Sequence, residues 1–308
     1  MLRFTARKLS LWIEITASAM RLAVLSGRGA NRTVLFTNTI ELPDGVVSEG
    51  YATPSIIDIS RLNDLLQECL SLFPSGIRRA ALSLPDSMFR IQTLDFEEIP
   101  AKTADLERLI RWRIEKGSVF DISETVLRYQ VLGRNNKGFI VLACVAKQVV
   151  IAQYEALLIG LGLEPWAVGP SSFHTWNFYS SYIANKSTVS ALVHLSENSL
   201  STIIGEEGVV RFYRYKDIKR VDADSFCKKF MREIDDSLHF YSHMNPARQT
   251  EVKDLYLTGD TVVATELAAG LRESTSLNVV VLSPALVVVG LANVGSEMAS
   301  ALGAGESL

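Results

Sequence analysis

The feature that most constrains this chain is a repeated set of three short apolar segments. One copy lies within residues 9–42 and the second within residues 189–215. In each copy a tight turn joins the first two segments, at Ala17–Ala19 in the first copy and at Glu197–Ser199 in the second. Apolar runs of this length between turn residues predict strands, and turns this short join antiparallel neighbours. We therefore predict two similar three-stranded meanders, one in each half of the chain.

Alternating helices and strands are expected to complete each half. Asp58 or Ser60 is a suitable helix cap before apolar residues at helical spacing. Pro284 is expected to open a final helix. The second turn of the first meander is assigned to residues 27–31. The other expected helices are 62–73, 103–116, 147–161, 173–183, 223–243 and 262–271, and the other expected strands are 79–84, 88–96, 126–132, 139–145, 255–259 and 279–282.

This order predicts an α/β protein of two lobes. Residues 1–77 are assigned to the first lobe and residues 78–166 to an inserted α/β subdomain. Residues 167–308 are assigned to the second lobe, with a C-terminal return to the first.

Composition narrows the class of function. A net charge of −3 gives no basic surface of the kind that binds nucleic acid, so no nucleic-acid partner is expected. The three cysteines lie far apart and form no Cys-x-x-Cys pair, which indicates free thiols in a reducing compartment. The apolar run Ala285–Ala292 is much shorter than the roughly 20 residues that span a bilayer, and Glu14 interrupts the first apolar run, so a cytoplasmic location is expected.

Several short motifs resemble those of one known family. The first strand reads Ile13-Glu14-Ile15-Thr16-Ala17-Ser18, with Arg21 soon after. The first strand of the second copy contains Val193-His194-Leu195-Ser196, and a later strand ends in Leu257-Thr258-Gly259-Asp260. The helix around Glu233 also matches. In this order and spacing they resemble the PilM proteins of type IV pilus assembly, which are related to FtsA and to the secretion protein GspL. The resemblance implies an actin-like (RNase H-like) fold with an inserted subdomain.

The same motifs depart from those of nucleotide-binding relatives. In the family pattern, glycines stand at the positions of Thr16 and Ser196, because phosphate loops turn their N–H groups to the anion without a Cβ in the way. An aspartate stands where this chain has His194, and neutral imidazole is a poor magnesium ligand. Asp260 adds negative charge near the expected phosphates. The resemblance therefore implies a vestigial nucleotide pocket formed by Glu14, Thr16, Ser18, Arg21, His194, Ser196, Glu233, Gly259 and Asp260.

We expect no catalytic residue, no metal site and no resident cofactor, while binding of ATP with magnesium stays open. An alternative is that the pocket residues are ordinary turn and strand-end residues. His239 and His243 have a metal-ligand spacing, but no third ligand lies near them in sequence. The dense aromatic residues of 173–182 are expected to form core between the lobes, with an exposed docking patch as the alternative.

The resemblance implies a scaffold of an inner-membrane assembly platform, in a type IV pilus or a type II secretion system. Its expected partner is the N-terminal cytoplasmic peptide of a PilN-like single-span membrane protein, docked between the inserted subdomain and the first lobe. Arg90–Leu94 is a candidate strand edge for that peptide. The chain would then be peripheral to the inner membrane through its partner. Two alternatives stay open: a working actin-like ATPase, and a self-associating protein that forms filaments.

Overall fold

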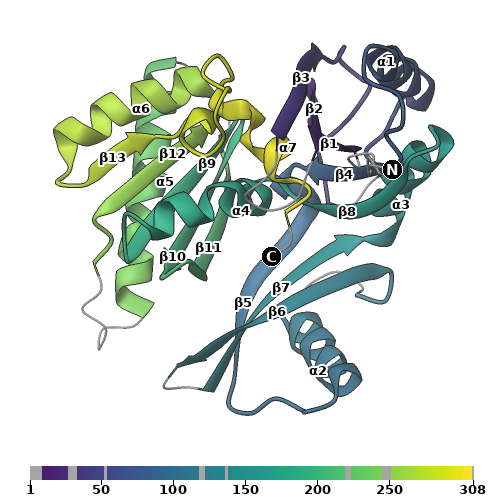
Figure 1. Ribbon diagram of the computed structural model, residues 1–308. Coiled ribbons are helices and arrows are strands. Elements are labelled where there is room, and N and C mark those ends of the chain that lie inside the picture. The colour runs from purple at the N-terminus through teal and green to yellow at the C-terminus, as the bar shows by residue number, and fades with distance from the viewer. Residues whose placement is uncertain are drawn as a thin grey trace, which may run out of the picture.

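The computed structural model describes residues 9–26, 33–51, 54–117, 122–135, 138–218, 223–244 and 251–306. Two lobes lie side by side, each built on one five-stranded sheet, and a three-stranded sheet with one helix projects from the first lobe (Figure 1).

The first lobe contains β1 (Leu9–Ile15), β2 (Ala19–Ser26), β3 (Thr33–Glu41), β4 (Arg79–Leu84) and β8 (Glu164–Pro170), in the order β3-β2-β1-β4-β8. The first three strands are antiparallel, whereas β4 and β8 run parallel to β1. The first predicted meander is therefore confirmed. The turn expected at residues 27–31 lies outside the described residues.

The second lobe repeats this arrangement. Its strands are β9 (Val189–Ser196), β10 (Ser199–Glu206), β11 (Val209–Asp217), β12 (Asp254–Gly259) and β13 (Asn278–Val281). Their order, β11-β10-β9-β12-β13, matches that of the first sheet strand for strand, with the same antiparallel and parallel pairings. The predicted duplication is confirmed.

Helices cover both faces of each sheet, because alternate side chains of a strand point to opposite faces. In the first lobe α1 (Ile59–Ser71) and α3 (Gln148–Gly160) pack on one face. In the second lobe α5 (Ala223–Met244) and α6 (Thr261–Ser274) cover the outer face. The inner faces of both sheets share one core with α4 (Ser171–Ala184) and α7 (Ala299–Gly303), which lie between the lobes (Figure 1).

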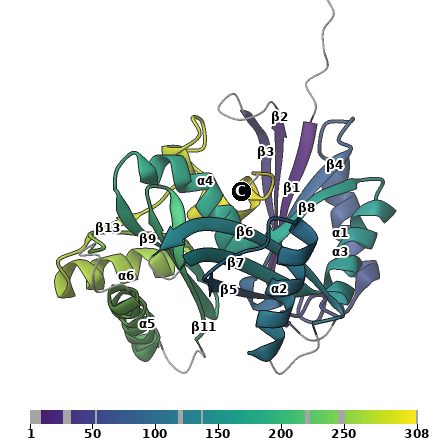
Figure 2. The ribbon, with the colours of Figure 1, turned by 90° about the horizontal axis from the view of Figure 1, so that it is seen from below.

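The projecting module consists of β5 (Phe89–Phe96), α2 (Thr103–Lys116), β6 (Thr125–Asn135) and β7 (Gly138–Lys147), seen in front in Figure 2. It has a core of its own, formed where α2 packs on the sheet. The rest of the segment 78–166 belongs to the first lobe, where β4 and β8 pair in its sheet and α3 packs on that sheet. The inserted sheet thus occupies residues 89–147, inside the segment 78–166 assigned from sequence.

Strand β8 was not expected from the sequence, because its seven residues contain Pro165, Gly169 and Pro170, which are unusual in strands. It is tolerated because it is the last strand of its sheet in the described part of the chain and pairs only with β4.

The helix predicted from Pro284 is wrong. Residues 284–286 form a single 3₁₀ turn, after which Gly290 takes a left-handed φ of +95°. The β-branched run Val287–Val289 disfavours helix, and the final helix α7 begins only at Ala299. The chain then returns to β1, where a Cβ on Gly305 would lie 2.2 Å from the Trp12 indole. In the described part of the chain, no helix is long and apolar enough to cross a membrane.

Candidate functional site

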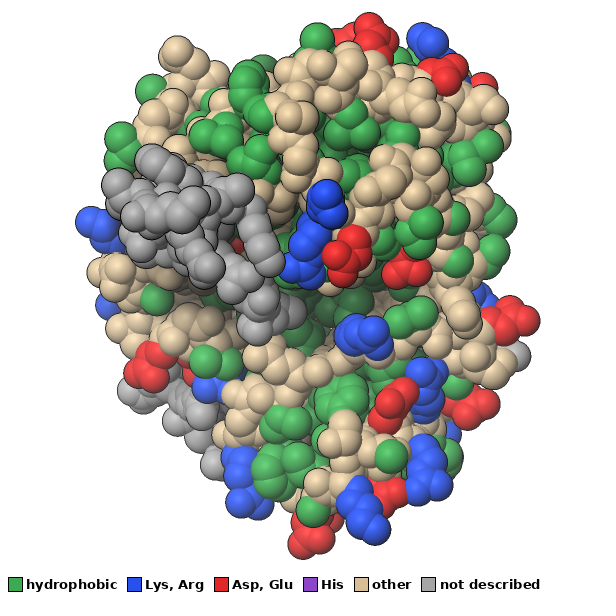
Figure 3. All heavy atoms as spheres, turned by 45° about the vertical axis from the view of Figure 1, so that its right-hand side comes forward, with side chains coloured by type: hydrophobic (Ala, Val, Ile, Leu, Met, Phe, Trp, Pro, Cys, Tyr) green, Lys and Arg blue, Asp and Glu red, His purple; other side chains and the backbone are tan. Residues whose placement is uncertain are grey.

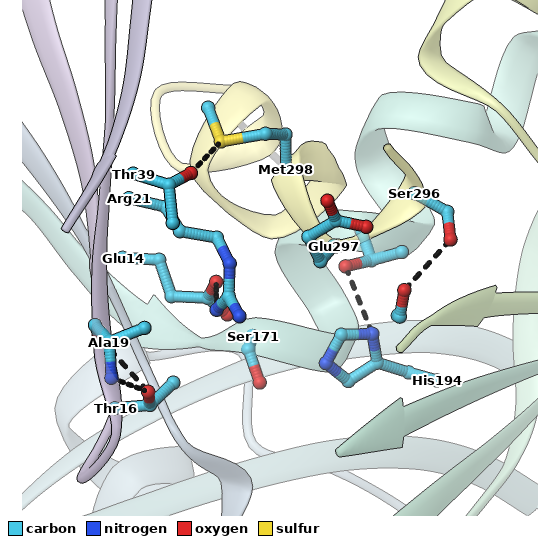
Figure 4. A network of polar contacts seen from close by, with 12 residues as sticks. Glu14, Thr16, Ala19, Arg21, Thr39, Ser171, His194, Ser296, Glu297 and Met298 are labelled. Atoms are coloured by element: carbon cyan, nitrogen blue, oxygen red, sulfur yellow. Dashed lines mark hydrogen bonds and ion pairs between the residues drawn. The ribbon is translucent and has the colours of Figure 1, made fainter. Parts of the chain in front are cut away.

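The family motifs converge on the inner faces of the two sheets, where the lobes meet. Glu14 of β1 and Arg21 of β2 face each other across one register position, and Glu14 is only 3% exposed. The Arg21 Nη1 to Glu14 Oε2 distance is 2.7 Å. A buried carboxylate is stabilised by such a partner, so Glu14 of the expected nucleotide pocket is paired with an arginine (Figure 4).

The turn after β1 is closed by a side chain rather than opened by glycine. Thr16 Oγ1 accepts a hydrogen bond from the Ala19 N–H and donates one to the Ala19 carbonyl, both at 3.0 Å. Thr16 does not have a positive φ, so the strain expected for a β-branched residue here does not arise. The threonine hydroxyl closes the turn locally.

A carboxylate from the first lobe occupies the same turn. The Ala17 N–H donates to Glu49 Oε1 at 3.0 Å, and this N–H lies in the turn that the family pattern assigns to phosphate binding. Loss of hydration raises the pKa of Glu49, the Ala17 hydrogen bond opposes that shift, and the nearby charges of Glu14, Glu197 and Asp217 raise the pKa further. The Glu49 side chain nevertheless lies at the surface, so solvent reduces these effects. Because acidic groups surround the turn from both lobes, it is a poor place for a polyanion such as ATP.

His194 of β9 faces Glu14 and Arg21 from the second lobe (Figure 4). Its side chain is buried, and its Nδ1 lies 3.4 Å from Thr175 Oγ1 of α4. Burial lowers the pKa of His194, Asp86 and Glu14 act to raise it, and burial dominates. A neutral, buried imidazole fits a packing position between the lobes rather than a magnesium site.

Gly259 and Asp260 have structural explanations. Gly259 has a φ of +101°, and a Cβ there would lie 1.9 Å from the Leu195 carbonyl oxygen of β9. The Asp260 carboxylate accepts hydrogen bonds from the backbone N–H groups of Val262 and Val263, each at 3.0 Å, and thereby caps α6. The charge of Asp260 is thus used at a helix N-terminus.

Glu233 does not join this cluster. It lies on α5, which covers the outer face of the second sheet, and its Oε2 lies 3.1 Å from Arg214 Nη2 of β11. His194 lies on the inner face, so the sheet itself separates the two residues. Ser18 is exposed in the first turn and Ser196 is half-buried at the end of β9.

The most heavily bonded buried carboxylate between the lobes, Asp86, was not singled out from sequence. Asp86 follows β4 in the first lobe and is only 5% exposed. Its Oδ1 accepts from Ser171 Oγ (3.2 Å) and from the Ser172 N–H (3.1 Å) at the start of α4. Its Oδ2 accepts from Ser201 Oγ (2.5 Å) and Tyr213 Oη (2.9 Å) of the second sheet. Four donors on one carboxylate connect both lobes through a single residue.

His174 adds a second buried imidazole to the interface. Its ring packs over β8, where a Cβ on Gly169 would lie 2.8 Å from His174 Nε2. Burial lowers the pKa of His174 to about 4, with a smaller opposing effect of Asp86. His174 was not singled out from sequence, although Gly169 lies only five residues before it, where β8 passes into α4.

The two histidines with metal-ligand spacing lie on the surface of α5. Within the described ranges, no three His, Cys, Asp or Glu side chains are arranged to hold a metal ion. His239 and His243 lie on the exposed side of α5, with His243 Nδ1 2.8 Å from the His239 carbonyl oxygen. Phe173, Trp176, Phe178 and Tyr179 are buried, which confirms that the aromatic segment forms core between the lobes.

Comparisons with known proteins agree with this architecture. No protein-family model and no curated protein sequence matches the chain. Among solved structures, it is similar to the PilM–PilN type IV pilus biogenesis complex, with a TM-score of 0.81, 20% identity and 96% of each chain covered. It is also similar to a protein of Bacteroides thetaiotaomicron with an actin-like ATPase fold (TM-score 0.56, 12% identity, 98% of each chain).

A further similarity is to the cytoplasmic domain of EpsL, an inner-membrane component of the type II secretion system of Vibrio cholerae. Its TM-score is 0.50 at 10% identity, over 81% of this chain and 82% of that one. The chain thus has the actin-like fold, and the likeness to PilM expected from sequence is confirmed at the level of the fold.

Proposed function

We propose that this protein is a cytoplasmic scaffold of an inner-membrane platform that assembles type IV pili or type II secretion pseudopili, and that it does not hydrolyse ATP. Its partner is the N-terminal cytoplasmic peptide of a PilN-like membrane protein. The observation that carries the proposal is that the groups at the expected nucleotide site already have partners within the protein.

Three groups at the expected nucleotide site already have partners within the protein. Glu14 is held by Arg21, the Ala17 N–H by Glu49, and Asp260 by the start of α6. Binding a nucleotide would require breaking these contacts and placing phosphates among Glu14, Glu49, Glu197 and Asp217. Among the described residues where the lobes meet, neither the turn after β1 nor His194 offers a preorganised phosphate cradle or a magnesium ligand.

The inserted sheet supports the partner assignment. The similarity to PilM, solved with PilN, extends over 96% of this chain and therefore includes the inserted module. Strand β5 is an edge strand of that module, in the order β5-β7-β6, and it includes the candidate edge Arg90–Leu94. An unpaired edge can accept an extended peptide as an added strand.

The recess beside β5 has the chemistry for such a peptide. Arg90 lies over the Tyr51 ring of the first lobe, with 4.4 Å from its guanidinium carbon to the ring centroid. In Figure 3 hydrophobic side chains show in the recess between the lower module and the body above it, with Lys and Arg side chains nearby. Apolar peptide side chains would fill the recess, while backbone hydrogen bonds form along β5.

Calorimetric titration with ATP and magnesium, up to millimolar nucleotide, tests the first part of the proposal. We expect no saturable heat from folded protein. The variant Glu49→Gln serves as a comparison, because it removes one negative charge from the turn while keeping an oxygen acceptor for the Ala17 N–H. Micromolar binding by the wild-type protein, with phosphate release, would instead establish the alternative of an actin-like ATPase.

Titration with a synthetic N-terminal peptide of a PilN-like protein from the same organism tests the second part. The matched variant replaces residues 90–145 with a Gly-Gly link, which is feasible because Phe89 and Ala146 are directly paired neighbours. We expect micromolar binding to the full chain and none to the shortened chain, provided that circular dichroism shows both lobes folded. Equal binding by the two proteins would place the peptide elsewhere, and no binding by either would reject the partner.

Cell fractionation tests the location. With the PilN-like protein present, we expect this chain in the membrane pellet, and we expect it in the soluble fraction when that partner is deleted. Retention in the pellet without the partner would contradict a peripheral attachment through it.

A further inference from the structure

Strand β3 forms an exposed edge of the first sheet. It is nine residues long, and in the described ranges it pairs only with β2 (Figure 1). Leu35 and Phe36 are 41% and 45% exposed, which is high for large apolar side chains. Phe36 also packs on Phe73, beyond the end of α1, with 6.1 Å between ring centroids.

The backbone of β3 offers a row of outward hydrogen-bonding groups. The Leu42 N–H donates to the Ser18 carbonyl, so the backbone groups of Leu42 point toward β2. Hydrogen bonding in an antiparallel ladder alternates from residue to residue, so the backbone groups of Ile40, Asn38 and Phe36 also point toward β2. The N–H and C=O groups of Thr37 and Thr39 therefore point away from the sheet.

This edge lacks the protection that sheet edges usually carry. Residues 33–40 contain no charged residue and no proline. A bulge at Leu35 interrupts only the beginning of the strand, and Phe36–Glu41 pair regularly with β2. The other three edges of the two five-stranded sheets are protected: β11 carries three Arg or Lys residues, β8 contains two prolines, and β13 has only four residues. A long, uncharged edge is a site for pairing with another strand.

We propose that β3 pairs antiparallel with β3 of a second copy of this chain, about a two-fold axis at Asn38. In this register Thr37 lies opposite the partner's Thr39 and exchanges backbone hydrogen bonds with it. Phe36 lies opposite the partner's Ile40, on the face that carries Phe73. The two first-lobe sheets thereby become one continuous sheet.

A second copy fits this edge because the strand is complementary to itself. In the proposed register Glu41 lies opposite the partner's Leu35, so no two like charges meet. The contact also covers the exposed side chain of Phe36. Leu72, which precedes Phe73, is 67% exposed and adds to the apolar surface on this face. An antiparallel, isologous contact closes after two copies, so it gives a dimer rather than a filament.

Sedimentation velocity of the full chain over a concentration series tests the proposal. We expect a reversible dimer. Thr37→Pro removes an N–H that points to the partner and none that pairs with β2, so the fold is retained while the dimer loses one bond on each side of the axis. We expect the dimer dissociation constant to rise roughly tenfold or more. Thr37→Val keeps the N–H and is the matched control, with an unchanged constant.

Two results would overturn the proposal. One is a wild-type chain that stays monomeric up to about 100 µM, because a specific dimer would associate at lower concentrations. The other is a Thr37→Pro variant with wild-type circular dichroism and an undiminished dimer, because the contact would then lie on another surface.

Oxidative cross-linking tests the register. Asn38→Cys places two thiols opposite each other at the axis, at the short Cβ separation of a non-hydrogen-bonded pair. Cys69→Ala is needed as background, because Cys69 Sγ lies 4.0 Å from Asn38 Nδ2. We expect a disulfide-linked dimer from this variant and at least tenfold less from Thr37→Cys in the same background. Equal cross-linking of the two would reject the proposed register.

Discussion

At the scale of single residues, the interface between the lobes depends on buried polar groups that are paired within the protein. Glu14 pairs with Arg21, and Asp86 accepts four hydrogen bonds. Burying a carboxylate is costly unless its oxygens are satisfied, and a full set of donors removes that cost. Asp86 connects the lobes, and the Glu14–Arg21 pair satisfies a buried carboxylate within the first sheet.

Asp86→Ala should be strongly destabilising. The substitution leaves Ser171 Oγ, the Ser172 N–H, Ser201 Oγ and Tyr213 Oη without their acceptor. We expect a loss of about 3–5 kcal/mol in the free energy of unfolding, measured by urea denaturation. The control Asp64→Ala, on the exposed side of α1, should change stability by less than about 0.5 kcal/mol. Similar small effects of both substitutions would show that Asp86 does not connect the lobes.

Stability should fall between pH 6.5 and pH 4 because of His174. Burial lowers its pKa to about 4, while the unfolded chain has the ordinary value near 6.5. In this range the unfolded state binds more protons than the folded state, so acid favours unfolding. The loss of stability disappears as the pH rises above 6.5, where His174 is neutral in both states. We expect His174 to contribute a loss of about 1–2 kcal/mol between pH 6.5 and pH 5. Urea denaturation of His174→Gln should show a correspondingly smaller pH dependence than the wild-type protein, and an identical pH dependence would contradict the assignment.

At the scale of elements, the ends of strands are decided by backbone contacts between strands. β12 ends at Gly259, where the chain turns into α6 directly against the β9 backbone. Gly259 is therefore required by the packing of β12 against β9.

Gly259→Ala should destabilise the protein far more than Gly162→Ala. Both glycines have positive φ, but a Cβ at Gly259 would lie 1.9 Å from the Leu195 carbonyl oxygen, whereas nothing lies within 4 Å of a Cβ at Gly162. The left-handed conformation alone costs about 1–2 kcal/mol. Urea denaturation should give about that loss for Gly162→Ala and at least about 3 kcal/mol for Gly259→Ala. Equal losses would mean that the β9 and β12 backbones do not approach so closely.

At the scale of the whole molecule, the two lobes share one core. Trp12 of the first sheet, Phe173 and Tyr179 of α4, Leu192 of the second sheet and Leu302 of α7 all belong to it. Two lobes that meet through a common core are expected to unfold together rather than separately.

Gly303→Ala should lower the stability of both lobes in one transition. Gly303 lies where α7 crosses α4, and a Cβ there would lie 2.0 Å from the His174 carbonyl oxygen, so the helices must move apart. We expect a fall of about 2–3 kcal/mol, with one cooperative transition by calorimetry and by tryptophan fluorescence. Gly160→Ala, at the end of α3 with open space around it, should be neutral or slightly stabilising. Separate transitions for the two lobes would show that α7 does not join them.

The sequence alone determined the duplicated meanders and most of the helices, because apolar periodicity and turn residues are local properties. The actin-like fold was implied by the resemblance of the motifs to those of PilM proteins. The sequence also located Glu14, Arg21 and His194 on facing strands. Arg21 meets Glu14 across the β1–β2 hairpin itself. Only the tertiary structure decided the contacts of Glu49 and Asp86, because their partners lie far away in the sequence. The same reason explains the missed strand β8 and the displaced final helix: each is fixed by a neighbouring element, β4 in one case and α4 with β1 in the other, and not by its own residues.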